Sequence, residues 1–253
     1  MSIKSIARNI LGKCISPFGY DIVPRRPVQE FPVDFSPDEQ AVWRYCRKFT
    51  LTAPGSLIAL TRAVEYVCLA GVPGDIVECG VWAGGSMAGV AMTLKRLEES
   101  RGLWLYDTFD VFRRPHSDLD VNWKGETAEE RKAAEGENWG GKPIDAVRKT
   151  LADTGYPESR MKFVKGYVED TIPVTKPDRI ALLRVDTDFY DSTKIELEHL
   201  YPRLSPGGIL IIDDYGCWQG ARKAADEYFA AQGIVPFLCR IEGSPVVMQK
   251  PHC

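Results

Sequence analysis

Two segments of the chain end in acidic side chains after a short apolar run. Asp186 follows residues 183–185, and the pair Asp213 and Asp214 follows residues 210–212. Short apolar runs are typical of buried strands, and parallel strands bring their carboxyl ends to one edge of a sheet. Carboxylates gathered there would raise each other's pKa, and a divalent cation relieves that repulsion. Because all the ligands are oxygens, we expect Mg²⁺, with Mn²⁺ or Ca²⁺ as substitutes.

Histidine and cysteine offer no alternative metal site. The three histidines are not spaced as ligands, and the seven cysteines are scattered without a CxxC pair. This pattern excludes a zinc site of His and Cys. Dispersed cysteines favour a reducing, cytoplasmic location. The formal net charge of −3 gives no reason to expect a nucleic-acid partner.

Asp188 lies two residues beyond Asp186 and is our candidate general base. An alcohol is too weak an acid to lose its proton unaided, so a metal and a nearby base would act on it together. Asp191 and Ser192 are expected to be helix caps. Asp214 has a second interpretation, as the cap of a helix near Trp218.

A glycine-rich turn follows an earlier buried strand, in the sequence Glu78-Cys-Gly-Val-Trp-Ala-Gly-Gly-Ser86. Gly80 permits the φ that a tight turn needs, and Gly84 with Gly85 would let a ligand approach the N–H groups of a helix. Asp107 ends the next strand, where a carboxylate can bind both hydroxyls of a ribose. These features predict a site for an adenosine-bearing cofactor. The alternative is that the two glycines only begin a well-packed helix.

The bulky Trp82 within this turn decides between cofactors. A dinucleotide fold uses glycine at this position, because the pyrophosphate must touch the backbone. S-adenosylmethionine has no phosphate, and its amino and carboxylate groups could be bound by Glu78 and the turn. An NAD-linked oxidoreductase is the second hypothesis and a non-catalytic cofactor-binding module the third.

Strand and helix signals alternate along the chain, which predicts parallel βαβ units in a doubly wound α/β sheet of the Rossmann-like class. Helices are expected at 56–71, from 84, near 144–154, from 191 and at 218–232. Strands are expected at 75–79, 103–107, 161–164, 180–185 and 208–213, with a closing antiparallel hairpin at 235–239 and 245–248.

Two further parts flank or interrupt this domain. Residues 1–55 are expected to form an N-terminal extension or lid before the main domain, 56–253. Within residues 1–55, Ile3, Ile6 and Ile10 share one helical face, which fits either a membrane-surface anchor or a helix packed on the protein. Residues 110–143 are polar and irregular and are expected to be an acceptor-binding insert. No run reaches the roughly 18 apolar residues of a membrane span.

Four motifs together resemble the macrocin O-methyltransferase family. The resemblance runs from about Thr50 to Val247 and rests on residues 73–86, 166–171, 184–193 and 204–215. It implies a class I methyltransferase fold that uses S-adenosylmethionine and Mg²⁺ to methylate a sugar hydroxyl in natural-product biosynthesis. It also implies a homo-oligomer. The acceptor would be a small molecule, such as a glycoside or another vicinal diol.

The resemblance also assigns roles to residues. The metal ligands would be Asp186, Asp213 and Asp214, and the base would be Asp188. The cofactor-binding residues would be Thr52, Glu78, Gly80, Ser86, Asp107, Gly166 and Tyr167.

Two departures from the family concern the acceptor. Where the family has Asp-Ser-Phe-Glu-Gly, this chain has Asp107-Thr-Phe-Asp-Val-Phe112, and the following insert is individual to this sequence. The family's macrolide substrates are therefore not transferred to it. Trp123 and Trp139 could stack on a sugar or could equally be packing residues.

Overall fold

The computed structural model describes residues 31–111, 113–114, 117–136 and 140–252. The chain divides into two units, residues 1–36 and 37–253, of which the larger contains the sheet. The stretch with Ile3, Ile6 and Ile10 lies outside the described residues, as does Trp139. No described helix is long and apolar enough to cross a membrane.

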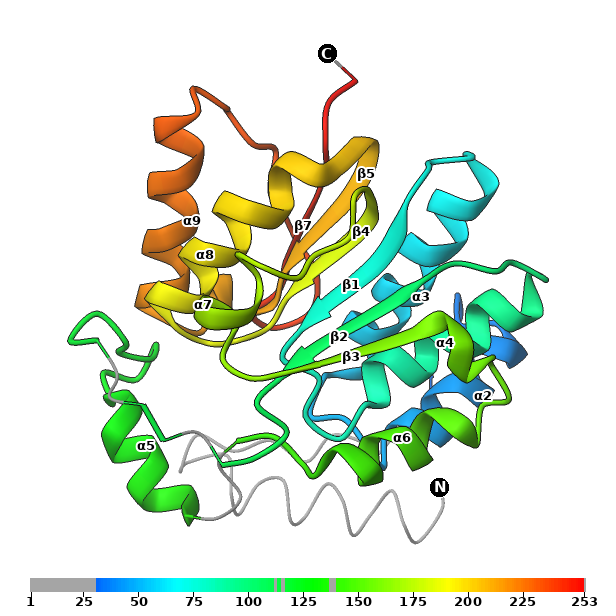
Figure 1. Cartoon of the computed structure of the whole chain (residues 1–253), viewed down its shortest axis with the longest axis horizontal. Helices are drawn as coiled ribbons and strands as arrows, with labels where there is room; N and C mark the ends of the chain where they lie inside the picture. Colours follow the sequence, from blue (N-terminus) through cyan, green and yellow to red (C-terminus); the bar gives the residue numbers. More distant parts are fainter. Residues whose placement is uncertain (1–30, 112, 115–116, 137–139, 253) are drawn as a thin grey trace, which may run out of the picture. The chain divides into compact units, whose positions relative to one another are not determined.

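One seven-stranded sheet forms the centre of the larger unit, in the order β3-β2-β1-β4-β5-β7-β6 (Figure 1). The first five strands in this order are parallel, and β7 is antiparallel to both of its neighbours, β5 and β6. The predicted doubly wound sheet with an antiparallel C-terminal end is therefore confirmed. The strands are β1 Asp75–Cys79, β2 Leu103–Asp107, β3 Met161–Lys165, β4 Ile180–Val185, β5 Leu204–Ile212, β6 Cys239–Arg240 and β7 Val246–Gln249.

Helices cover both faces of this sheet, because side chains along each strand point alternately to opposite faces. Ile76 and Leu105 belong to a core with one group of helices, whereas Val77 and Tyr106 belong to a core with the other. Figure 1 shows the two groups on opposite sides of the sheet. The first comprises α2 Pro37–Cys46, α3 Pro54–Leu69, α4 Gly85–Arg96 and α6 Ile144–Ala152; the second comprises α7 Val168–Thr171, α8 Tyr190–Leu200 and α9 Gln219–Ala231.

Two predictions about local structure were wrong. The expected strand at 235–239 is reduced to Cys239–Arg240, and the residues before it are coil, in which exposed and half-buried residues alternate. Asp191 and Ser192 do not cap α8, whose N-cap is Phe189 without a side-chain hydrogen bond. The Ser192 hydroxyl instead donates to the carbonyls of Thr187 and Phe189.

The insert contains a helix that we did not predict, α5 Ala128–Glu135. It begins with a capping box, in which the Thr127 side chain accepts from the Glu130 N–H and the Glu130 side chain accepts from the Thr127 N–H. A capping box stabilises the first turn of a helix by satisfying two N–H groups that have no partner within it.

Gly80 allows the ends of the two central strands, β1 and β4, to meet. Its φ is +84°, and a Cβ there would overlap the carbonyl oxygen of Asp186. The Asp186 N–H in turn donates to the Cys79 carbonyl at 3.0 Å. Gly80 thus brings the glycine turn after β1 against the acidic segment after β4. In sheets of this type, ligands bind at this carboxyl edge, where the strand order reverses.

Candidate functional site

The structure brings Asp186, Asp213 and Asp214 together at the carboxyl edge of the sheet. Asp186 follows β4, and the other two begin a short 3-10 helix, η5 Asp213–Gly216, directly after β5. The two strands pair with Val185 opposite Ile212, so their ends are level. One carboxylate oxygen from each of the three acids lies within 4.8 Å of the others.

Arg184 supplies a buried positive charge to this cluster. Its side chain is 3% exposed and forms an ion pair with Glu78 from β1. Its guanidinium nitrogens also lie 2.6 Å from Asp186 Oδ2 and 2.6 Å from Asp213 Oδ1. The planar fork of arginine suits it to hold several carboxylates at once. From the sequence, Arg184 is expected to be a surface or ion-pair residue rather than a substrate clamp. The structure shows the ion pairs, and it shows that they are buried rather than on the surface.

One arginine does not balance the negative charge of the cluster. Burial raises the pKa of Asp186 and of Asp214 well above the ordinary value, and neighbouring acids add to this effect. Arg184 occupies only one oxygen each of Asp186 and Asp213, which leaves their second oxygens for another cation. An all-oxygen donor set with surplus negative charge fits Mg²⁺ or Mn²⁺.

Asp188, the candidate base, lies beside the three acids. Its backbone is left-handed, with φ +69°, and its N–H donates to Asp214 Oδ2 at 2.9 Å. Burial, together with the nearby charge of Asp186, raises the pKa of Asp188 to about 7, and hydrogen bonds with the side chains of Trp218 and Asp214 oppose this shift. A carboxylate with a pKa near neutrality is suited to general-base catalysis.

Asp214 is not a helix cap. The Asp214 Oδ2 accepts from the Asp188 N–H, and α9 has no side-chain cap.

Glu78 has a buried oxygen that no described group satisfies. Its side chain is 1% exposed, Oε1 is paired with Arg184, and Oε2 has no hydrogen-bond partner. Burial raises its pKa to about 7, although Arg184 lowers it. A buried acceptor without a partner costs free energy unless a ligand supplies a donor. The ammonium group of a methionine moiety would be such a donor.

Ser86 and Thr52 lie beside the same guanidinium. The Ser86 hydroxyl is 3.2 Å from Arg184 Nη1, and the Thr52 hydroxyl is 3.0 Å from Nη2. The two hydroxyls are 3.4 Å apart. The segment before α3, the first turn of α4 and the end of β4 therefore meet at Arg184, which links the predicted cofactor residues to the predicted metal ligands.

Asp107 has a structural role that the sequence did not reveal. Its Oδ2 accepts from the N–H groups of Val81 and Trp82 at 2.9 and 3.0 Å, and Oδ1 accepts from Phe109 N–H at 2.8 Å. The carboxylate thus fixes the glycine turn after β1. The Thr108 hydroxyl also donates to Oδ1, at 3.4 Å, so these four donors match the roughly four lone-pair sites of the carboxylate. Contact with a ribose stays a prediction.

Gly166 and Tyr167 lie next to Asp107, at the end of β3. The Gly166 N–H donates to the Asp107 carbonyl at 3.0 Å. The Tyr167 hydroxyl accepts from the backbone of Arg113, and the Arg114 guanidinium lies 3.9 Å from the centroid of the Tyr167 ring. These contacts connect the predicted cofactor residues Gly166 and Tyr167 to the insert.

Comparison with known proteins is consistent with this geometry. The profile of the macrocin O-methyltransferase (TylF) family matches residues 35–250. The chain belongs to this family. A relative in Streptomyces olivaceus, 8-demethyl-8-(2,3-dimethoxy-alpha-L-rhamnosyl)-tetracenomycin-C 4'-O-methyltransferase, is 33% identical over 87% of this chain and 84% of its own. Mycinamicin III 3''-O-methyltransferase of Micromonospora griseorubida is 32% identical over 76% of this chain and 74% of its own length.

Solved structures give the same assignment. The O-methyltransferase NovP superposes with a TM-score of 0.70 at 30% identity, covering 80% of this chain and 82% of that one. This macrocin O-methyltransferase family member is therefore an O-methyltransferase, and its fold is one that binds S-adenosylmethionine.

One interpretation of the glycine turn needs correction in this family member. Gly84 and Gly85 do not leave room for a ligand at the start of α4. The Gly85 N–H donates to the Phe49 carbonyl at 2.8 Å, and a Cβ on Gly85 would lie 2.5 Å from that oxygen. A Cβ on Gly84 would meet Val147 of α6. The two glycines are needed because the protein's own segments pack here.

Glu196 is a further buried acid that sequence reasoning missed. It lies on α8 with 0% exposure, and its Oε1 accepts from the Thr187 hydroxyl at 2.9 Å. Burial raises its pKa well above the ordinary value. Because Thr187 stands between Asp186 and Asp188, Glu196 supports the segment that carries the metal ligand and the candidate base. An isolated Glu at a buried helical position is the signal that could have identified it.

Backbone strain is concentrated at the same edge. Among the described non-glycine residues, positive φ values occur at Trp82, Phe109 and Asp188, which follow β1, β2 and β4, and at Glu98 after α4. Left-handed backbone at bulky residues costs free energy and is typical of functional sites. Three neighbouring strand ends therefore carry strain where the predicted ligands would bind.

Proposed function

We propose that the protein transfers a methyl group from S-adenosylmethionine to a hydroxyl on the sugar of a glycosylated natural product. The observation that carries this proposal is the convergence of Asp186, Asp213 and Asp214 beside Glu78 at the carboxyl edge of the sheet. The names of the relatives support the acceptor class, because they describe methylation of sugar-bearing compounds.

The residues divide the chemistry between them. Glu78 and the turn after β1 would hold the methionine part of the cofactor. Asp186, Asp213 and Asp214 would hold Mg²⁺, which when bound lowers the pKa of a coordinated hydroxyl. Asp188 would accept the hydroxyl proton while the oxygen forms its bond to the methyl carbon and the carbon–sulfur bond breaks. The neutral thioether S-adenosylhomocysteine leaves, so charge and atoms balance.

The cofactor assignment predicts that the protein binds S-adenosylhomocysteine with micromolar affinity and does not bind NADH. Isothermal titration calorimetry with each ligand measures this directly. Incubation with S-adenosylmethionine, Mg²⁺ and a panel of rhamnosides and other glycosides should then yield a product that mass spectrometry finds one methylene unit heavier. Binding of NADH alone would instead support the oxidoreductase hypothesis.

The assignment of Asp188 as base predicts that Asp188→Asn lowers kcat by about 100-fold. An amide cannot accept the proton, but it retains the size of the side chain. The affinity for S-adenosylhomocysteine should stay within about threefold of the wild type. Turnover of the best glycoside from the panel, followed as S-adenosylhomocysteine release, provides the measurement. Asp191→Asn, an exposed acid in the first turn of α8, is the matched control and should not change kcat. Equal kcat values for Asp188→Asn and the wild type would remove Asp188 from the mechanism.

A further inference from the structure

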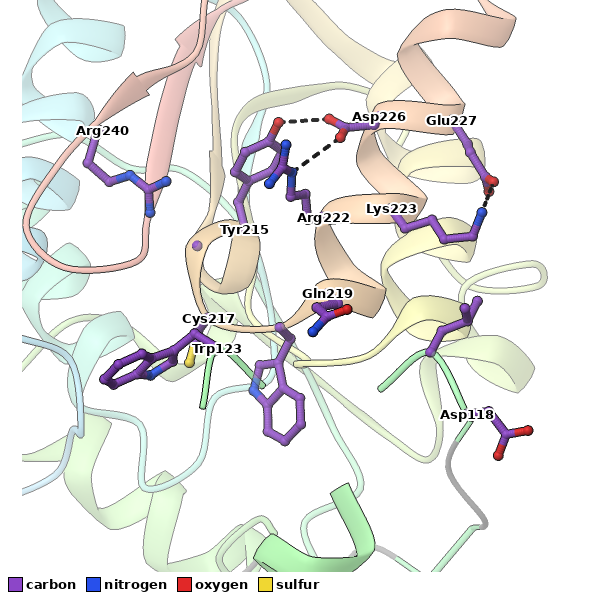
Figure 2. A pocket seen from close by; sticks show the side chains of 13 residues that line it. Asp118, Trp123, Tyr215, Cys217, Gln219, Arg222, Lys223, Asp226, Glu227 and Arg240 are labelled. Carbon is purple, nitrogen blue, oxygen red and sulfur yellow. Dashed lines mark hydrogen bonds and ion pairs between the residues drawn. The ribbon is translucent and has the colours of Figure 1, made fainter. Parts of the chain in front are cut away.

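A groove opens between the insert and the start of α9. Its volume is about 910 Å³, in the upper part of the range of roughly 300–1,000 Å³ for sites that bind drug-sized molecules. Its walls come from the insert, from η5 and α9, and from Arg240 of β6 (Figure 2). A single sugar ring would leave much of this space empty.

Backbone hydrogen bonds fix the insert to the opposite wall. The Trp123 N–H donates to the Cys217 carbonyl at 2.8 Å, and the Gln219 N–H donates to the Val121 carbonyl at 2.9 Å. Between them, Asn122 and Trp218 form an antiparallel bridge. The groove is therefore built by paired segments rather than by a free loop.

Trp218 connects this groove to the candidate base. Its side chain is 5% exposed, lines the groove and hydrogen-bonds to Asp188. Its ring packs edge-on against Phe189, with centroids 5.4 Å apart. Trp218 is therefore part of the wall of the groove and also a neighbour of Asp188, so the groove lies next to the candidate base.

The charged side chains of the groove cancel one another. Asp118, Asp226 and Glu227 are the acids, and Arg222, Lys223 and Arg240 are the bases. Each base already has a partner. Figure 2 shows the ion pairs Arg222–Asp226 and Lys223–Glu227, and Arg240 donates to the carbonyls of Gly243 and Ser244.

This balance bears on the occupant. A nucleoside diphosphate sugar would bring at least two negative charges, which need uncommitted basic groups. The groove instead offers aromatic surface. Trp123 is 70% exposed, and the Lys124 ammonium lies 5.3 Å from the centroid of its ring. An exposed indole beside a ligand site provides a flat apolar surface on which an uncharged ring can stack.

We propose that the groove between Asp118–Trp123 and Tyr215–Arg222 binds the uncharged aglycone of a glycoside acceptor, with Trp123 as its stacking surface. The inference rests on the proposed function, because Asp188 defines where the sugar lies. It places a glycosyl transfer before the methylation, since the aglycone must already be attached when the sugar is methylated.

Trp123→Ala tests this assignment with two simple acceptors, 4-nitrophenyl α-L-rhamnoside and methyl α-L-rhamnoside. The aryl group would occupy the groove, whereas the methyl group would not reach it. The variant should raise KM for the aryl rhamnoside by about tenfold and leave KM for the methyl rhamnoside within twofold. Phe237→Ala removes an aromatic ring that is 83% exposed outside the groove, so it is the matched control and should change neither KM. An equal rise in KM for both acceptors, or no rise for either, would overturn the proposal. A lower KM for a nucleoside diphosphate rhamnose than for the aryl rhamnoside would also overturn it.

A binding measurement separates this proposal from the proposed function. Protein labelled with 5-fluorotryptophan gives a ¹⁹F resonance for Trp123 that the Trp123→Phe variant identifies. Titration of the aryl rhamnoside in the presence of S-adenosylhomocysteine should shift that resonance saturably. A resonance that stays in place in protein that binds S-adenosylhomocysteine rejects the groove but retains the methyltransferase. Absence of S-adenosylhomocysteine binding rejects the proposed function itself.

Discussion

Asp213→Ala should lower turnover by about 1,000-fold or more while S-adenosylhomocysteine affinity stays within about threefold of the wild type. The reason is that Asp213 would be a metal ligand, and loss of a metal that activates the hydroxyl removes several kcal/mol of transition-state stabilisation. The fold should survive, because Arg184 keeps its contacts with Glu78 and Asp186 when Asp213 is gone. Calorimetric titration of Mn²⁺ should show a site in the wild type and a greatly weakened site in the variant.

Asp178→Ala provides the matched control for this experiment. Asp178 is an exposed acid just before β4, at the opposite edge of the sheet from the cluster. Its removal should change neither Mn²⁺ affinity nor turnover. Full turnover of the wild type in the presence of EDTA would show that the carboxylate cluster does not act through a metal.

The strands could be predicted because burial on both faces leaves a simple signal. β4 is buried at every position from Ile180 to Val185, and its mostly apolar run indicates a strand without knowledge of the surrounding elements. The strand expected before Cys239 failed for the opposite reason, since Val235 is 96% exposed and Phe237 is 83% exposed. Apolar residues indicate a strand only when a partner surface covers them, and the sequence does not show which surface is covered.

The acids at the carboxyl edge could be anticipated because topology alone brings parallel strand ends together. What could not be anticipated is how each side chain is used. The role of Asp107 in holding the glycine turn depends on N–H groups of Val81 and Trp82 that only the folded turn directs at it. The contacts of Gly85 depend on Phe49, a residue distant in the sequence. Such long-range contacts leave no periodic signal.

Arg184 is the residue whose role was hardest to read from the sequence. A charged residue within a buried strand is rare unless it is paired, so Arg184 itself marked an unusual position. Its partners come from three strand ends, and which acids it meets follows from the order of the strands in the sheet. Pairing of a buried charge is a property of the assembled edge rather than of any segment.

Arg184→Met should therefore destabilise the protein by about 3–5 kcal/mol, because it leaves buried carboxylates without their counter-ion. For a domain of this size the corresponding fall in Tm is roughly 6–20 °C. Thermal unfolding followed by circular dichroism measures the change. Arg148→Met removes an exposed ion pair with Glu158, for which we expect a loss of about 0–1 kcal/mol.

The pH dependence of the stability loss in Arg184→Met shows whether lost charge pairing causes it. Burial raises the pKa of Glu78 to about 7 in the folded protein even with Arg184 present, so its folded pKa lies above the unfolded value of 4.5. A raised carboxyl pKa means that folding favours the protonated form, and stability falls as pH rises from the unfolded pKa through the folded one. Without Arg184 this fall should be steeper, so the variant should lose more stability relative to the wild type at pH 8 than at pH 5. A deficit that is the same at both pH values would indicate lost packing rather than lost charge pairing. Arg184→Lys retains the charge but not the fork that spans Glu78 and Asp213, and its deficit at pH 8 should lie between those of the wild type and Arg184→Met.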